Sequence, residues 1–215
     1  TAQNTRDPTP PAVLQIHGAP EAQYRPTFDP LIQYMAYHGF TVVVPNIRGS
    51  LGYGKAYEQL DNIEKRLDSI KDIAWLRDHL VAEKVATPDR VIVRGGSYGG
   101  YAVLACLTFH PELWAAGVST VGISSLVTFL ENTTPYRRGY REAEYGSLEN
   151  DRELLETMSP LNFVDKITAP LFMIHGKNDP RVPVTEAIQI NDKLTELGRE
   201  VELHIYDDEG HGLAK

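Results

Sequence analysis

The chain has 215 residues, a length that suits one domain with a sizeable core and excludes a large two-domain protein. It carries 21 Lys and Arg against 29 Asp and Glu, and this net charge of −8 is spread along the sequence, which argues against nucleic-acid or anionic-lipid binding. Hydrophobic residues at 42% and charged residues at 23% are typical of a globular domain and exclude a disordered or fibrous chain.

Cysteine content and hydropathy exclude further classes. The single cysteine, Cys106, cannot form an intramolecular disulfide or supply a cysteine-based metal site. No apolar run approaches the ~20 residues of a membrane span, and the opening TAQNTRDPTPP lacks the hydrophobic region of a signal peptide, although a trimmed N-terminus would look the same. We therefore expect a cytoplasmic chain without a membrane span.

Short apolar runs alternate along the chain with segments of helical periodicity. Continuous β-branched runs suit strands that are covered on both faces of a parallel sheet, and strand, helix, strand at this spacing is a βαβ unit. In chain order, the predicted strands cover residues 12–17, 40–44, 91–93, 114–119, 170–175 and 201–206, and the predicted helices cover 28–37, 70–84, 98–109 and 184–197.

The stretch at about 124–163 interrupts this alternation, because it is charged, rich in tyrosine and only partly helix-like. An irregular stretch between regular units is where a lid-like insertion facing the substrate would lie. The remaining pattern predicts an α/β fold in one domain over residues 1–215. In it, a mostly parallel sheet is flanked by helices on both faces as a three-layer sandwich.

The segment GGSYGGY at 95–101 lies between a predicted strand and a predicted helix. Within it, Ser97 has a glycine two residues before and two residues after, the G-x-S-x-G pattern of a nucleophile elbow. This strained turn exposes the serine hydroxyl at a helix N-terminus and is too crowded for larger flanking residues. A glycine-rich helix entry is the alternative. The dinucleotide-binding motif G-x-G-x-x-G does not fit this segment, because Ser97 occupies the third position, where the motif requires a glycine.

A serine nucleophile needs a base that is oriented by a carboxylate, in the chain order Ser, Asp or Glu, His for this fold. Asp179 follows the predicted strand 170–175, and His211 follows the last predicted strand. Both loops then leave the sheet at the same edge as Ser97. We predict Ser97 as nucleophile, His211 as base and Asp179 as the residue that orients the base.

Other residues compete for these roles. Asp179 precedes a proline and could be only a turn former. His17 and His175 lie at strand ends and could face the site, although neither follows the last strand. Three acidic residues compete as the carboxylate, although they precede the base too closely to come from a separate strand end: Asp207, Asp208 and Glu209.

The oxyanion hole should combine two backbone N–H groups. One belongs to Tyr98, the residue after the nucleophile, and the other to Ala19 in the loop after the first strand. Gly18 and the small Ala19 allow the backbone to approach a substrate, whereas Pro20 has no N–H to donate. A plain Gly-Pro loop is the alternative for this segment.

Seven segments occur in an order that belongs to a known family: HGAPEAQ (17–23), PNIRGSLGYG (45–54), GGSYGGY (95–101), YRR with EYG (136–146), SP (159–160), IHGKNDPRVP (174–183) and DEGHG (208–212). Together they resemble the α/β-hydrolase catalytic domain of the prolyl oligopeptidase family of serine peptidases, in the branch of acylaminoacyl and dipeptidyl peptidases. The resemblance covers nearly the whole chain. It implies the same roles for Ser97, Asp179 and His211 as the fold logic does.

The chain departs from this family pattern in three ways. Some family members use a tyrosine side chain as an oxyanion donor, and this chain has His17 at that position. A backbone donor at Ala19 therefore resembles more closely the branch of the family that carries the sequence HGGP. Members usually carry a β-propeller, for which there is no room here. Their hydrolase domain also extends further at both ends, so we expect a shortened domain in which strand 40–44 is an exposed sheet edge, either covered or paired in a homo-oligomer.

The resemblance implies a serine hydrolase that cleaves ester or peptide bonds of small substrates through an acyl-enzyme on Ser97. The expected substrate is a small ester or a short peptide, and no cofactor, metal or nucleic acid is expected. Arg137 and Arg138, in the irregular stretch, could bind a substrate carboxylate or carbonyl, or form a solvated charge pair. The alternative function is a catalytically silent α/β-hydrolase-fold module for binding or assembly.

Overall fold

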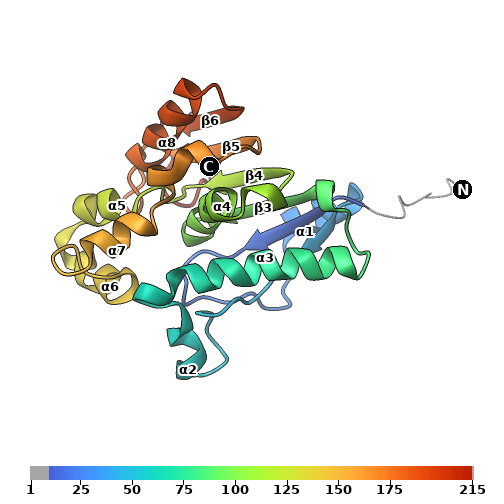
Figure 1. Ribbon diagram of the computed structural model, residues 1–215, viewed down its shortest axis with the longest axis horizontal. Coiled ribbons are helices and arrows are strands. Elements are labelled where there is room, and N and C mark those ends of the chain that lie inside the picture. Colours follow the sequence, from blue (N-terminus) through green and yellow to red (C-terminus); the bar gives the residue numbers. More distant parts are fainter. Residues whose placement is uncertain (1–9, 215) are drawn as a thin grey trace, which may run out of the picture.

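The computed structural model describes residues 10–214; the predicted polar leading segment lies mostly outside them, at residues 1–9. The described strands form one six-stranded parallel sheet in the order β2-β1-β3-β4-β5-β6 (Figure 1). All six strands match predicted ones. Their bounds are β1 (Ala12–Ile16), β2 (Thr41–Val43), β3 (Val91–Gly96), β4 (Ala116–Thr120), β5 (Leu171–Gly176) and β6 (Val201–Tyr206).

Helices connect the strands. Of the predicted helices, 98–109 is reproduced residue for residue, whereas the helix predicted at 70–84 begins four residues earlier, in a polar turn. No helix that the structure describes is long and apolar enough to cross a membrane. The helices are α1 (Pro30–Tyr37), α2 (Lys55–Glu58), α3 (Arg66–Ala82), α4 (Tyr98–Phe109), α5 (Leu126–Asn132), α6 (Pro135–Tyr145), α7 (Arg152–Thr157) and α8 (Thr185–Glu196).

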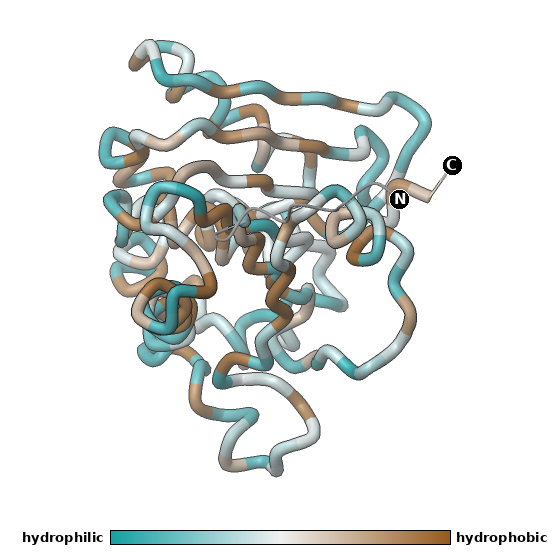
Figure 2. The backbone as a smooth tube through the Cα atoms, turned by 90° about the vertical axis from the view of Figure 1, so that its right-hand side faces the viewer, coloured by the Kyte–Doolittle hydropathy of each residue, from teal (hydrophilic) through white to brown (hydrophobic). Residues whose placement is uncertain are grey.

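The core lies between the sheet and α4. Every residue of α4 except Phe109 is buried, which explains why its sequence is apolar all round. A methyl group built on Gly117 of β4 would stand 2.6 Å from Leu107 of α4, so the glycine lets this helix lie close against the sheet. Figure 2 shows the hydrophobic residues concentrated on the strands and the central helix, with hydrophilic residues on the outer loops.

The two faces of the sheet are covered unequally. Right-handed crossovers that run toward opposite edges place their helices on opposite faces, so α1, between β1 and β2, lies on the face opposite α3, α4 and α8. Along β3, and along β5 as far as His175, buried residues on the α4 face alternate with half-buried residues on the α1 face. The three-layer α/β arrangement is therefore confirmed, with α1 as a thin third layer that buries no residue of its own.

The insertion at 124–163 is more regular than predicted. It contains α5, α6 and α7, followed by a 3₁₀ segment, Pro160–Lys166. The helices are short because each is bounded by local signals, such as Ser125, whose hydroxyl accepts a hydrogen bond from Thr128 N–H at the start of α5. Few apolar positions recur at helical spacing in such short elements, so periodicity alone did not reveal them.

Candidate active site

The candidate site lies at the carboxyl ends of β1 and β3. These strands are neighbours, with Ile16 paired to Gly95, and the chain leaves them toward opposite faces of the sheet. Open α/β sheets bind ligands in the crevice at this kind of switch point. The loop after β1 and the turn after β3 touch there, because Gly18 lies against the backbone of Gly96 with no space for a side chain.

Ser97 occupies a strained turn between β3 and α4. Its φ of 59° and ψ of −118° are unusual for a residue with a side chain. A methyl group on Gly95 would stand 2.4 Å from the carbonyl oxygen of Gly99, and one on Gly99 would stand 2.4 Å from that of Ile16. The glycines of the G-x-S-x-G pattern are therefore needed for close backbone contact. The result is the strand–turn–helix geometry of a nucleophile elbow.

Ser97, His211 and Asp179 form a continuous chain of hydrogen bonds. Nε2 of His211 lies 3.0 Å from Oγ of Ser97, and Nδ1 of His211 lies 2.7 Å from Oδ2 of Asp179. Because a carboxylate can only accept, we assign the His211 proton to Nδ1 and let Nε2 accept from the Ser97 hydroxyl. The structure thus brings the three predicted residues together from three loops at one edge of the sheet.

Asp179 is held as a carboxylate. Its Oδ1 accepts the backbone N–H groups of Arg181 at 2.8 Å and Val182 at 3.0 Å, which leaves Oδ2 for His211. Burial alone would raise the pKa of Asp179, but the hydrogen bonds from His211 and from these two N–H groups outweigh burial and lower it. The aspartate therefore stays ionised beside the imidazole across the neutral pH range.

Two of the competing acids have partners of their own. Asp207 forms an exposed ion pair with Lys177 at 2.8 Å, and the carboxylate of Glu209 accepts the backbone N–H of Ala214. The carboxylate of Asp179 accepts the hydrogen bond from Nδ1 of His211. The loop 207–210 instead packs beside the end of β5, where a methyl group on Gly176 would meet the carbonyl oxygen of Gly210 at 2.3 Å.

The two competing histidines have structural partners instead. His175 is fully buried; its Nε2 donates to the carbonyl oxygen of Val182 at 3.0 Å and lies 3.6 Å from Oδ2 of Asp179. Burial lowers the pKa of His175 and also that of His17, so both rings are neutral near pH 7. The ring of His17 contacts Ser50 rather than Ser97.

Both predicted oxyanion donors border the cavity beside Ser97. Tyr98 is the first residue of α4, where a backbone N–H has no partner within the helix. Ala19 has a φ of 51°, so the loop turns sharply at this residue, directly over the elbow. The cavity beside Ser97 is therefore bordered by both residues whose N–H groups were predicted to form the oxyanion hole.

The cavity in front of Ser97 has a volume of about 190 Å³. Its apolar wall consists of Ile123, Phe129, Tyr145 and Val182. This volume admits a small acyl group or one amino-acid side chain rather than a large ligand.

Two arginines that were not among the predicted site residues border the cavity. Arg141 of α6 and Arg181 of the loop after β5 both line it, and the Arg141 guanidinium lies 5.8 Å from the Phe129 ring centroid. The candidates proposed in this region, Arg137 and Arg138, do not line it. Arg137 borders a second cavity of about 300 Å³, and Arg138 donates to the carbonyl oxygen of Glu131. The four-residue spacing of Arg141 and Tyr145 on α6 could have revealed their shared face.

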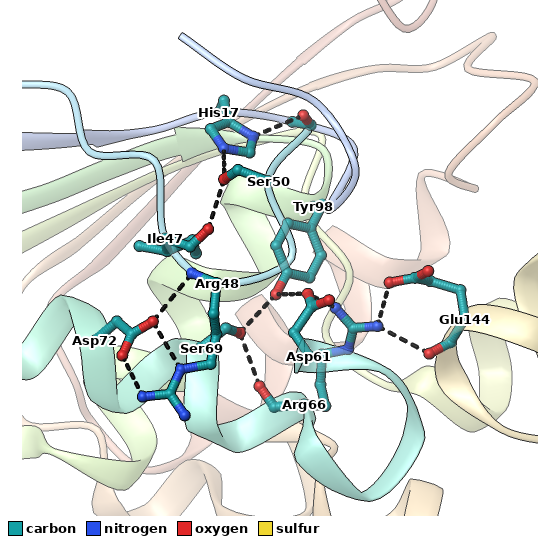
Figure 3. A network of polar contacts seen from close by, with 11 residues as sticks. His17, Ile47, Arg48, Ser50, Asp61, Arg66, Ser69, Asp72, Tyr98 and Glu144 are labelled. Atoms are coloured by element: carbon teal, nitrogen blue, oxygen red, sulfur yellow. Dashed lines mark hydrogen bonds and ion pairs between the residues drawn. The ribbon is translucent and has the colours of Figure 1, made fainter. Parts of the chain in front are cut away.

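A buried polar cluster lies behind the elbow (Figure 3). The Arg66 guanidinium pairs with Asp61 and Glu144 and lies 5.1 Å from the ring centroid of Tyr98 and 4.8 Å from that of Tyr145. Burial is the main reason that the pKa of Tyr98 rises to about 12 and that of Asp61 to about 6. No local pattern in the sequence indicates this cluster, because Arg66 and Glu144 alone lie 78 residues apart.

Among residues 10–214, no group of three or more His, Cys, Asp or Glu side chains could hold a metal ion.

Comparison with known proteins adds independent information. A profile of the prolyl oligopeptidase family matches residues 26–215. Dipeptidyl aminopeptidase BIII of Pseudoxanthomonas mexicana is 37% identical over 214 residues, covering 95% of this chain and 30% of that protein. Dipeptidyl peptidase family member 6 of Caenorhabditis elegans is 36% identical over 210 residues, covering 94% of this chain and 28% of that protein.

Solved structures agree with the sequence matches. A puromycin-hydrolyzing peptidase of Mycobacterium tuberculosis superposes with a TM-score of 0.91 at 30% identity, over 95% of this chain and 31% of that one. The acylaminoacyl peptidase of Pyrococcus horikoshii gives a TM-score of 0.87, also at 30% identity, over 96% of this chain and 34% of that one. This chain spans about a third of the length of the proteins that it matches.

Proposed function

Because the chain belongs to the prolyl oligopeptidase family, we propose that it is the α/β-hydrolase catalytic domain of a serine hydrolase, and that it forms an acyl-enzyme on Ser97. The hydrogen-bonded chain from Ser97 through His211 to Asp179 carries this proposal. The family peptidases that it resembles support peptide-bond cleavage as the reaction class.

In the first half of the proposed reaction, Oγ of Ser97 attacks the carbonyl carbon of the substrate while Nε2 of His211 takes the hydroxyl proton. The carbonyl oxygen becomes an oxyanion, which the N–H groups of Tyr98 and Ala19 stabilise. His211 then returns the proton to the departing alcohol or amine. Water attacks the acyl-enzyme by the same route, with His211 again as base, and this step frees Ser97.

Asp179 stabilises the imidazolium form of His211 that exists during each proton transfer. Its backbone hydrogen bonds fix one carboxylate oxygen, so the other stays directed at Nδ1 of the ring. The lowered pKa of Asp179 matches this role, since a protonated carboxyl could not hold the imidazole in the same tautomer.

We propose a small ester or a short peptide as the substrate. The cavity of about 190 Å³ limits the acyl side chain, and its apolar wall favours an uncharged or aromatic group beside the scissile bond. Esters should react faster than amides of the same acid, because an alkoxide departs more readily than an unprotonated amine. A catalytically silent module is the less favoured alternative, since the three side chains are already in hydrogen-bonding positions.

The decisive experiment compares hydrolysis of short-chain p-nitrophenyl esters with hydrolysis of proline- and alanine-containing dipeptide amides, together with covalent labelling by a fluorophosphonate. We expect turnover and labelling by the wild-type chain, and loss of both in Ser97→Ala. Ser147→Ala, a serine outside the cavity, is the matched control and should keep both.

Two results would contradict the proposal. Ester turnover that persists in Ser97→Ala would reject Ser97 as nucleophile. A folded wild-type chain that neither turns over substrate nor reacts with the fluorophosphonate would favour the silent module. Amide turnover by the wild-type chain would identify a peptidase, whereas ester turnover alone would identify an esterase.

A further inference from the structure

The two candidate oxyanion donors come from segments that are far apart in the sequence. Ala19 belongs to the loop after β1, and Tyr98 opens α4 after β3. An oxyanion hole works only when its donors are directed at one point within a few tenths of an ångström, so something must hold these two segments relative to each other. The close contact of Gly18 with Gly96 limits their approach but does not fix their orientation.

The Tyr98 segment is tied to helix α3 through the tyrosine hydroxyl. Oη of Tyr98 lies 2.8 Å from Oγ of Ser69, and the Ser69 hydroxyl lies 2.8 Å from the carbonyl oxygen of Arg66. Since the serine proton is given to that carbonyl, Tyr98 is the donor in the bond to Ser69, and its hydroxyl also lies 3.4 Å from Oδ2 of Asp61. Both side chains are almost fully buried, so water does not compete for this bond.

The Ala19 segment reaches the same helix by a longer route. Nε2 of His17 lies 2.9 Å from Oγ of Ser50, Nδ1 of the same ring lies 3.2 Å from the carbonyl oxygen of Gly18, and the Ser50 hydroxyl lies 2.6 Å from the carbonyl oxygen of Ile47. His17, two residues before Ala19, is thereby bound to the turn at residues 47–50. His17 and Ser50 are also buried.

That turn is fixed in its place by Asp72 of α3. The carboxylate accepts the backbone N–H of Arg48 at 3.0 Å and two guanidinium N–H groups of the same arginine at 2.9 and 2.6 Å. A bidentate pair that also binds the backbone holds both the position and the direction of the turn. Figure 3 shows the two routes side by side, one ending at Ser69 and the other at Asp72.

Ser69 and Asp72 are three residues apart on α3, so they lie on the same face of the helix. We propose that Ser69 and Asp72 are positioning residues, and that α3 is the common support that holds the two oxyanion donors relative to each other. This inference rests on the proposed function. Neither residue touches the substrate, because Ser69 acts through the Tyr98 side chain and Asp72 acts through Arg48, Ser50 and His17.

Support of this kind affects the transition state more than the bound substrate, because only the oxyanion needs both donors in place. Each of Ser69→Ala and Asp72→Asn should lower kcat for a small ester by about 10-fold to 100-fold while KM changes less than about 3-fold. The affinity for a peptide trifluoromethyl ketone, whose adduct with Ser97 carries an oxyanion, should fall by the same factor as kcat/KM.

Two further variants sharpen the test. Tyr98→Phe keeps the ring and the backbone N–H but removes the hydroxyl together with its 3.4 Å contact to Asp61, so it should lower kcat at least as much as Ser69→Ala, and adding Ser69→Ala to it should cause little additional loss. Asp78→Asn is the matched control: it lies on the same helix, carries an exposed carboxylate paired with Arg77, and should leave kcat and the ketone affinity unchanged.

Thermal unfolding of every variant shows whether it remains folded. If Ser69→Ala does not fold, Tyr98→Phe still tests the hydrogen bond between Tyr98 and Ser69. Unchanged kcat in folded Ser69→Ala and Asp72→Asn would overturn the inference. So would a loss confined to KM, or a loss of kcat without loss of ketone affinity. An inactive wild-type chain would instead reject the proposed function, so the two failures are distinguishable.

Discussion

Gly18 and Gly96 pack backbone against backbone: a methyl group built on the α-carbon of Gly18 would stand 2.9 Å from the carbonyl oxygen of Gly96. It would also stand 3.3 Å from Cβ of Ser97. Both atoms belong to the elbow or its nucleophile, so the loop after β1 would have to move rather than the elbow. The expected consequence is a displaced Ala19 N–H.

Gly18→Ala should therefore lower kcat for a small ester by about 10-fold to 100-fold, with a smaller change in KM. Steady-state kinetics measures both constants. Gly139→Ala is the control, because nothing lies within 4 Å of its added methyl group. That control should keep its activity, and its helical position should make it up to about 1 kcal/mol more stable. Equal activities of the two variants would contradict the proposed place of Ala19.

Asp179→Asn should lower kcat by about 10³-fold to 10⁴-fold, because an amide cannot stabilise the imidazolium and can hold His211 in the wrong tautomer. Asp207→Asn, which removes an exposed partner of Lys177, should change kcat less than 2-fold. The comparison is made on one ester under identical conditions. If Asp207→Asn were the more damaging change, the orienting role would belong to the loop before His211 instead.

Asp61 predicts a pH dependence of stability. Its pKa is raised from 3.8 to about 6, mainly by burial, so the folded chain binds this proton more tightly than the unfolded chain does. The contribution of Asp61 to the free energy of unfolding is therefore complete below about pH 4 and is lost as the pH rises to about 6. Relative to Asp61→Asn, the wild-type chain should lose on the order of 2–3 kcal/mol of unfolding free energy across this interval.

Urea denaturation of the wild-type chain and of Asp61→Asn at several pH values between 4 and 7 measures that difference. The sign is the critical result. A difference that stays constant, or one in which the wild-type chain gains stability with rising pH, would show that the Arg66 charge rather than burial controls the Asp61 carboxyl.

Arg66→Met should destabilise the fold by about 3–5 kcal/mol, because it leaves Asp61 and Glu144 in a buried cluster without their cation. Arg152→Met is the matched surface change. Its guanidinium pairs with Glu131 and Glu156 but is about half exposed, so the loss should stay below about 1 kcal/mol. Chemical denaturation measures both variants, and similar losses would contradict a structural role for the buried cluster.

Cys106 is fully buried in α4, and burial raises the pKa of its thiol far above the ordinary value. The thiolate is the reactive form of cysteine. A thiol reagent such as dithionitrobenzoate should therefore react with the native chain at a negligible rate and with one equivalent after denaturation in urea. Rapid reaction of the native chain would indicate that α4 opens frequently.

Pairing of two copies through the β2 edge remains a prediction. β2 is an edge strand of only three residues, all of them half-buried. Sedimentation velocity over a range of concentrations tests it. If a dimer forms, Val42→Pro, which removes an N–H from this strand, should weaken the dimer more than a proline introduced in an exposed loop.

The sequence was informative where local chemistry determines structure. The helix at 98–109 was predicted to the residue because its start is the elbow and Pro111 follows its end. Asp179 and His211 could be chosen because the carboxyl ends of parallel strands meet at one edge, whatever the details of packing. Helix α1 begins two residues later than predicted, since Asp29 caps it by accepting the N–H groups of Leu31 and Ile32.

Long-range contacts were not accessible in the same way. The first turn of α3 escaped detection because Arg66 and Ser69 are polar residues in the interior, and periodicity of apolar residues cannot mark them. Arg66 meets Glu144 across 78 residues of sequence, and Ser69 meets Tyr98 across 29. No local pattern relates such positions, so the support behind the elbow could be recognised only from the folded structure.

The thin third layer implies that the molecule does not open uniformly. α1 buries no residue, and β6 is half-buried or exposed along its whole length, whereas α4 and β1 lie inside the core. Amide protons of α1 and of the sheet edges should therefore exchange with solvent through small local openings, and those of β1 and α4 only through global unfolding. We expect the elbow, set between β3 and α4, to open as rarely as these two elements do, so Ser97 should keep its strained geometry while the periphery fluctuates.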